Sequence, residues 1–125
     1  MTHKLRYRQG EERLVALIGD EDTVTGFLLA GTGANDPRKS KGSNFLVVNK
    51  STPLADIEGA LKKFLERGDI GIVIICQHVA NDVRHILSEH KSPIPIVMEI
   101  PSKDTPYDGE KDEVLTKINR SLGLK

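Results

Sequence analysis

The chain has 125 residues, a length that suits one domain and leaves little room for a second core. Its 18 basic and 18 acidic residues balance, so no net charge draws it onto nucleic acid or an anionic membrane surface. The single cysteine, Cys76, has no partner for an intrachain disulfide, which favours a cytoplasmic setting over a secreted one. The longest apolar run, 70–76, is far shorter than the about 20 residues that a spanning helix needs, so we expect no direct membrane insertion.

Residues 1–12 mix basic and acidic side chains and contain no apolar segment of the kind that a secretory signal requires. We therefore predict a polar N-terminal arm over 1–12. An α/β domain is predicted over 13–102, followed by a linker and a C-terminal helix over 103–125.

Four short apolar segments recur along the chain, rich in Val, Ile and Leu and without polar alternation. This composition is typical of parallel strands that helices cover on both faces. The four predicted strands are 14–18, 45–48, 70–76 and 94–100. Between them the apolar residues recur with the helical period, which predicts three intervening helices. The three helical stripes are Val24, Phe27, Leu28 and Gly31; Leu54, Ile57, Leu61 and Phe64; and Val79, Val83, Ile86 and Leu87.

Residue types that start and end helices support these boundaries. Asp20 or Asp22 can cap the first helix, and Gly31 and Gly33 can end it. Residues 51–53, Ser-Thr-Pro, suit the cap and first-turn positions of the second helix. With right-handed crossovers, the alternating order predicts a small doubly wound parallel sheet of four strands. Such a Rossmann-type α/β fold resembles flavodoxin or a receiver domain, and we expect the strand order 2-1-3-4.

The chain changes character after Ile100. Pro101 and Pro106 exclude a regular helix in the stretch that follows, and a last helix is predicted over 111–122. Its apolar stripe consists of Val114, Leu115, Ile118 and Leu122. Because a segment joined by two prolines can leave the body of the domain, the residues leave two alternatives open. The stripe packs on the domain's own helices or on another chain.

One acidic cluster follows the first predicted strand. In the sequence Asp-Glu-Asp-Thr-Val, Asp20 and Asp22 resemble the carboxylate pair of a phosphoryl-transfer enzyme, in which one carboxylate attacks phosphorus and the other acts as acid or base. Two carboxylates at this position could also bind Mg²⁺. A receiver domain would need an aspartate at the end of the third strand, where Cys76 stands. We favour the simpler interpretation that these acids satisfy free N–H groups at the start of a helix. The alternative function is a small Mg-dependent receiver-like or phosphoryl-transfer domain using Asp20 and Asp22.

Two further patterns fall short of a site. Gly33 begins an imperfect phosphate-binding loop, in which Arg38 replaces the second glycine and Pro37 removes an N–H donor. His78 and His85 lie seven residues apart, but zinc sites need three or four closely spaced ligands. The basic residues are dispersed and aromatics are few, unlike a nucleic-acid stacking surface. We therefore predict no catalytic residue, no cofactor, no metal and no nucleic-acid partner.

Longer stretches of the chain resemble a known family. They are Leu17–Gly31 (LIGDEDTVTGFLLAG), Gln77–Ala80 (QHVA), Pro95–Lys103 (PIVMEIPSK) and Pro106–Asp108 (PYD). In this order and spacing they resemble the F subunits of eukaryotic vacuolar-type proton-pumping ATPases. The resemblance spans nearly the whole chain, and the EIPSK stretch followed by PYD is its most specific part.

The resemblance implies a non-catalytic component of the central rotor shaft, which couples ATP hydrolysis in the catalytic head to rotation and proton transport. It implies binding to the coiled-coil D subunit, contacts with the membrane-sector d subunit and the catalytic head, and a peripheral place on the cytosolic face of vacuolar and other internal membranes. It also implies that the C-terminal helix lies along the D subunit. The expected interface residues are Tyr107, Lys111, Val114, Leu115, Ile118 and Leu122.

Overall fold

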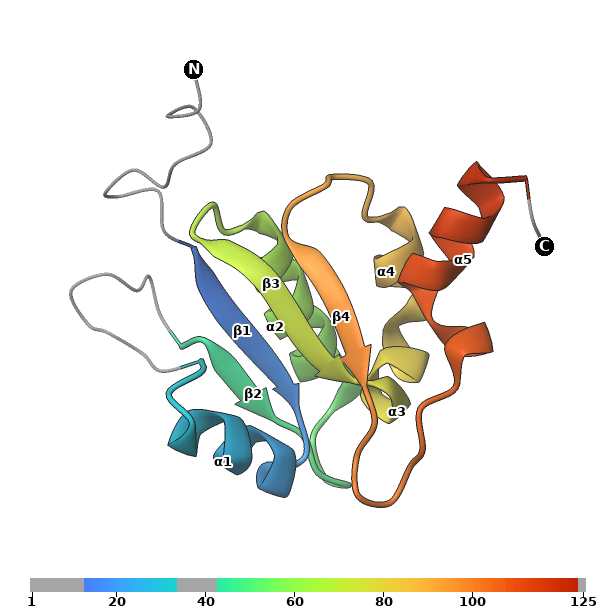
Figure 1. Ribbon diagram of the computed structural model, residues 1–125. Helices are drawn as coiled ribbons and strands as arrows, with labels where there is room; N and C mark the ends of the chain where they lie inside the picture. Colours follow the sequence, from blue (N-terminus) through green and yellow to red (C-terminus); the bar gives the residue numbers. More distant parts are fainter. Residues whose placement is uncertain (1–12, 34–42, 124–125) are drawn as a thin grey trace.

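The four apolar segments pair into one parallel sheet, as predicted (Figure 1). The strands are β1 (Leu14–Gly19), β2 (Phe45–Val47), β3 (Ile70–Cys76) and β4 (Ile96–Ile100). Their order is β2-β1-β3-β4, which confirms the predicted order. The computed structural model describes residues 13–33 and 43–123, so the predicted arm over 1–12 lies outside the described residues, as does most of the imperfect phosphate-binding loop.

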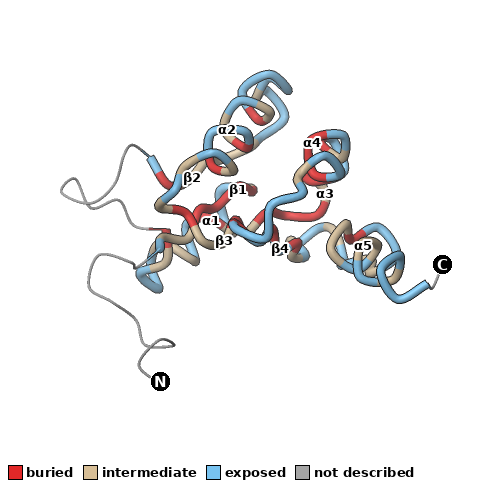
Figure 2. Tube along the Cα trace, turned by 90° about the horizontal axis from the view of Figure 1, so that it is seen from above, coloured by how far each residue is buried: buried red, intermediate tan, exposed pale blue. Residues whose placement is uncertain are grey.

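Helices cover the two faces of this sheet unequally. They are α1 (Glu21–Leu29), α2 (Leu54–Glu66), α3 (Gln77–Ala80), α4 (Arg84–Glu89) and α5 (Glu113–Ser121). Figure 2 shows α2, α3 and α4 on one side of the sheet, α1 on the other, and α5 beyond the β4 edge. Most of the buried core lies between the sheet and the α2 to α4 layer. Within the described ranges, no helix is long and apolar enough to cross a membrane.

The predicted third helix is interrupted. Four residues of α3 are followed by a 3-10 turn, Asn81–Val83, before α4 begins at Arg84. Asn81 and Asp82 are poor helix formers because their side chains compete for nearby polar groups. The Asn81 side chain here accepts a hydrogen bond from Arg84 Nη2 at 2.8 Å. The predicted apolar stripe is nevertheless buried throughout the broken segment, at Val79, Val83, Ile86 and Leu87.

Several boundaries differ from the prediction, and two of these differences have a plain physical reason. Helix α2 begins after Pro53, which takes the N-cap position without a side-chain cap, while Ser51 N donates to Asn49 Oδ1 at 2.9 Å. Residues 51 and 52 therefore form a turn with Asn49 and do not cap the helix. Strand β4 begins at Ile96 and not at residue 94, because Pro95 has no amide N–H to donate to a ladder.

The sheet face on the α1 side is covered at β1 and open at β4. The strand register places Leu17, Ile74 and Met98 side by side in one row across β1, β3 and β4. Exposure rises along this row: Leu17 is 2% exposed, Ile74 is half-buried and Met98 is 48% exposed. The prediction that every strand is buried on both faces is therefore wrong for β4.

Candidate partner interface

The segment between β4 and α5 is held to the body by Gln77. Its side-chain amide donates through Nε2 to the carbonyl oxygen of Asp108 at 2.7 Å, and the backbone N–H of Asp108 donates to Gln77 Oε1 at 2.6 Å. Gln77 is 2% exposed, so these bonds satisfy polar atoms that water does not reach. These two hydrogen bonds fix the position of Asp108, where the chain turns toward α5.

Glu99 is a buried carboxylate that joins β4, α4 and α5. It accepts hydrogen bonds from both Nη atoms of Arg84, at 2.6 and 2.8 Å, and from Gln77 Nε2 at 3.0 Å. It also accepts from the backbone N–H of Glu113, the first residue of α5, at 2.9 Å. Burial alone would raise the pKa of Glu99, but these donors outweigh it and hold the pKa below its ordinary value. A carboxylate at this position also suits the positive end of the α5 dipole.

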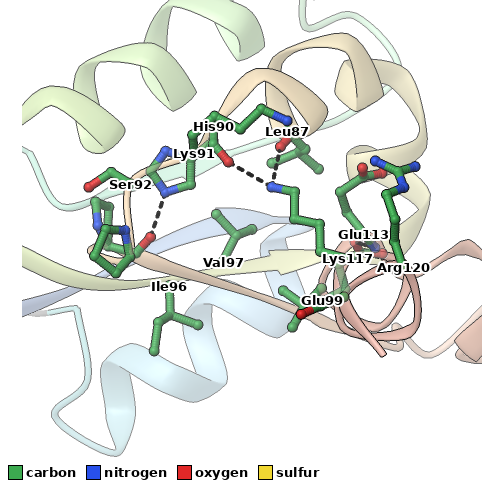
Figure 3. Close-up of a pocket in the computed structure, with 14 residues that line it drawn as sticks. Leu87, His90, Lys91, Ser92, Ile96, Val97, Glu99, Glu113, Lys117 and Arg120 are labelled. Carbon is green, nitrogen blue, oxygen red and sulfur yellow. Dashed lines mark hydrogen bonds between the residues drawn. The ribbon is translucent and has the colours of Figure 1, made fainter. Parts of the chain in front are cut away.

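Lys117 ties the body of α5 to the end of α4. Its ammonium donates to the carbonyl oxygen of Leu87 at 2.9 Å and to that of His90 at 2.7 Å (Figure 3). These acceptors lie at a helix C-terminus, where carbonyls outnumber N–H donors. Burial lowers the pKa of Lys117. Helix α5 is thus docked on its own domain through polar groups.

A groove of about 490 Å³ separates α5 from α4 and β4 (Figure 3). Leu87 of α4, Val97 of β4 and Val114 of α5 line it. Figure 3 shows the Lys117 side chain extending across the groove toward Leu87 and His90. Val114 is the one member of the predicted apolar stripe that lines this groove, and it is half-buried. It therefore faces the body of the domain.

The other three residues of the predicted stripe are exposed. Leu115, Ile118 and Leu122 are 40%, 47% and 68% exposed, and none of them lines the groove. Their spacing of three and four residues places them on one face of the helix. We call these three residues the α5 stripe. Of the two alternatives that the sequence leaves open, packing on the domain itself holds for Val114. Packing of the other three residues on another chain stays a prediction.

Tyr107 and Lys111, also predicted at the interface, lie in the segment just before α5. The Tyr107 hydroxyl donates to the carboxylate of Asp112, the N-cap residue, which also accepts from the backbone N–H of Val114 at 2.9 Å. The hydrogen bond to Asp112 raises the pKa of Tyr107 to about 12. Tyr107 therefore contacts the N-cap residue of the helix while the residue as a whole remains 42% exposed, and Lys111 is also exposed.

The acidic residues of the alternative hypothesis have structural partners. Asp20 caps α1, accepting from the backbone N–H of Thr23 at 3.1 Å and from its hydroxyl at 2.7 Å. Burial would raise the pKa of Asp20, but the bonds from Thr23 outweigh it and lower the pKa. Asp22 pairs with Lys103. In the part of the chain that the structure describes, no three His, Cys, Asp or Glu side chains are grouped to hold a metal ion. The sequence predicts Asp20 or Asp22 as the cap of the first helix, and the structure shows that Asp20 takes this position.

Glu99 and Lys117 were not among the residues that the sequence predicted at a site. A lone carboxylate within an apolar strand is a usable signal, because an unpaired buried charge is costly and a cation must lie near it. That argument would have called for a partner such as Arg84. Lys117 gives no comparable signal, since its acceptors are backbone carbonyls.

An α/β body that presents a short helix with an exposed apolar face has the architecture of a component of a larger assembly. Residues 15–118 match the family described as ATP synthase (F/14-kDa) subunit, and the chain belongs to this family. This match confirms the resemblance that the sequence motifs indicate.

Several relatives are named as F subunits of V-type proton ATPases. The one from Dictyostelium discoideum is 52% identical over 113 residues, covering 90% of this chain and 92% of that protein. The one from Homo sapiens is 52% identical over 108 residues, covering 86% and 89%. The crystal structure of the V-type ATP synthase F subunit of Archaeoglobus fulgidus matches with a TM-score of 0.50 and 26% identity, covering 71% of this chain and 98% of that one.

Proposed function

We propose that this chain is a non-catalytic central-stalk component of a V-type proton-transporting ATPase. Its role is to couple ATP hydrolysis in the catalytic head to rotation and proton transport by binding the coiled-coil D subunit. Family membership supports a place in this complex. The chain belongs to the soluble sector on the cytosolic face of vacuolar and other internal membranes, near the d subunit and the catalytic head.

The α5 stripe is the observation that carries the proposed contact with the D subunit. Leu115, Ile118 and Leu122 recur at the spacing by which one helix packs against another. Full burial of such a side chain contributes on the order of 1.5 to 3 kcal/mol before association costs, and these residues are already partly buried, so each would contribute less. The hydrogen bonds of Glu99 and Lys117 hold α5 in place before binding, so less conformational entropy is lost when a partner binds the helix.

The same hydrogen bonds suit a subunit that transmits torque during rotation. Glu99 and Lys117 connect α5 to β4 and α4, so a force applied to the helix reaches the sheet and its covering layer. Close-packed interiors deform little. A stiff body gripped through a firmly docked helix transmits rotation with little loss.

The test is co-purification with the same organism's D subunit. Four forms of the chain are compared: full length, a version ending at Ser102, Ile118→Asp and Asn119→Asp. We expect the full-length chain to co-elute with the D subunit, and the truncation and Ile118→Asp to weaken the complex at least about tenfold. Asn119→Asp is the matched control because it adds the same charge one residue away from the α5 stripe, and it should bind normally.

Two results would contradict the proposal. Failure of the full-length chain to form any complex with the D subunit would remove the assignment of the partner. Equal binding by the full-length chain and Ile118→Asp would keep that partner but remove the α5 stripe from the contact. Circular dichroism of each form shows whether it is folded.

A further inference from the structure

The open face of β3 and β4 is an apolar surface that the α5 stripe does not explain. The register places four side chains on it, Ile72 and Ile74 of β3 and Ile96 and Met98 of β4, which we call the β3–β4 face. Ile96 and Met98 are 52% and 48% exposed. Figure 2 shows that α1 lies toward the other end of the sheet on this side, while α5 stands beyond the β4 edge.

The chemistry of β4 does not match its exposure. A strand with one face in water alternates apolar buried positions with polar exposed ones. Strand β4 alternates in burial, but its exposed residues are Ile96 and Met98, and its charged residue, Glu99, is 6% exposed. The β3–β4 face therefore has the composition of a surface that is covered in the working protein.

The uncovered width suits one helix. Neighbouring strands lie about 4.8 Å apart, so two strands present a strip roughly 10 Å wide, and a helix with its side chains is about 10 to 12 Å across. In parallel sheets that helices cover on both sides, a further helix lies at this position beside α1. The space therefore fits an α-helix with an apolar stripe.

The residues of the printed sequence that lie outside the described ranges offer no apolar stripe for that helix. Outside the described residues are 1–12, 34–42 and 124–125, which are polar in most positions. Their apolar residues are Met1, Leu5, Tyr7, Ala34 and Leu124, too few and too scattered for a helical stripe. Because the printed residues do not supply the cover, we look for it on another chain.

The size of a stable interface also requires a second surface. Specific interfaces bury about 800 Å² on each partner and involve roughly 20 to 30 residues a side. Helix α5 has nine residues, and the α5 stripe has only three members. A partner that a rotating component grips firmly therefore needs more contact area than α5 provides.

We infer that the β3–β4 face binds an apolar helical stripe of the same partner that contacts the α5 stripe. The partner's identity rests on the proposed function. A coiled coil offers two helices with axes about 8 to 10 Å apart. Helix α5 stands beyond the β4 edge (Figure 2). In the inferred complex, one helix of the coiled coil therefore lies on the β3–β4 face while its neighbour contacts α5.

The first experiment measures protection of introduced thiols. Met98→Cys probes the β3–β4 face, and Leu29→Cys, at an 84% exposed position of α1, is the matched control. The native Cys76 is buried and reacts little in the folded chain. On adding the D subunit we expect alkylation of the Met98→Cys variant to slow at least about tenfold and that of the Leu29→Cys variant to stay unchanged.

The second experiment measures affinity. Met98→Lys places a charge on the face and should weaken binding of the D subunit at least about tenfold, whereas Leu29→Lys should leave it unchanged. Both positions are exposed in the isolated chain, so the folded state should tolerate both substitutions.

The outcomes separate this inference from the proposed function. If the D subunit binds and Ile118→Asp weakens binding, but the Met98→Cys variant reacts at an unchanged rate, the β3–β4 face is not the contact and only this inference falls. If the full-length chain does not bind the D subunit, the proposed function is wrong, and the partner assigned to the β3–β4 face is wrong with it. Protection that rises with the chain's own concentration, without the D subunit, would assign the face to a second copy and overturn the inference.

Discussion

Glu99 accepts four hydrogen bonds from three different elements, so its charge affects more than its own strand. The substitution Glu99→Gln removes the negative charge that compensates Arg84. It also replaces one of the two acceptor oxygens of the carboxylate with an NH2 donor. Loss of one partner of a fully buried pair costs about 3 to 5 kcal/mol, but Arg84 is 25% exposed, so we expect a loss of about 2 kcal/mol in the free energy of unfolding. Urea denaturation followed by circular dichroism measures it. Glu110→Gln, an exposed carboxylate nearby, should stay within about 0.5 kcal/mol of the parent.

The lowered pKa of Glu99 also predicts a pH dependence. Because its pKa in the folded chain lies below the ordinary value of 4.5, the unfolded chain takes up the proton first on acidification. The stabilisation is fully present above pH 4.5 and is lost as the pH falls through the lowered value. Denaturation curves from about pH 7 to about pH 3 should show a shallower decline for Glu99→Gln than for the parent. Identical declines in the two proteins would contradict this prediction.

Helix α5 depends on Lys117 for its attachment to α4. In Lys117→Met the aliphatic stem remains but both bonds to the α4 carbonyls are lost. We expect amide hydrogen exchange in α5 to become roughly tenfold faster, while exchange in β1 and β3 is unchanged, because local opening does not require global unfolding. Lys111→Met is the control, since Lys111 is exposed and precedes the helix. Unchanged exchange in α5 would show that Glu99 and Gln77 alone hold it.

Two glycines around α1 should respond oppositely to alanine. Gly33 has φ of +80°, and a Cβ there would lie 2.6 Å from Cδ1 of the buried Leu17, so Gly33→Ala should cost about 2 kcal/mol. Gly26 lies within α1 with nothing within 4 Å of an added Cβ, so Gly26→Ala should stabilise by up to about 1 kcal/mol. Thermal denaturation shows whether each variant has a higher or a lower melting temperature than the parent. A stabilising Gly33→Ala would show that the turn after α1 adjusts freely.

The order of the elements was predictable because strands and helices differ in apolar period. The stripe of α2 reads at helical spacing, and its members Ile57, Leu61 and Phe64 are all buried. The break between α3 and α4 was not predictable from the same stripe, because Val79 and Val83 stay buried whether the backbone is α-helical or passes through a 3-10 turn. Periodicity reports which side is covered and says little about the exact helical form.

Binding to the D subunit should stabilise the whole chain. A ligand that binds only the folded state adds about 2.7 kcal/mol at a concentration one hundred times its dissociation constant. Urea or thermal unfolding of the chain with and without the D subunit, at that ratio for the parent, measures the gain. Ile118→Asp should gain much less at the same concentration, and Asn119→Asp should gain as much as the parent. An equal gain in all three would contradict a contact through the α5 stripe.

The site was predictable in part. The apolar residues of α5 were visible in the sequence, but their division between the groove at Val114 and the exposed Ile118 depends on how the helix is rotated about its axis. That rotation is set by Glu99 and Lys117, which contact residues distant in sequence. For Ile96 and Met98, composition indicates a covered face, but a single sequence does not say which chain covers it.

The exposed apolar residues of β4 also affect how the cell handles the chain before assembly. A chain that presents Ile96 and Met98 together with an apolar helix carries a surface that chaperones and degradation machinery recognise in incomplete proteins. Covering that surface removes the signal, so survival becomes coupled to the supply of the partner. We therefore expect unassembled copies to be short-lived and the amount of this chain to follow the amount of its partner.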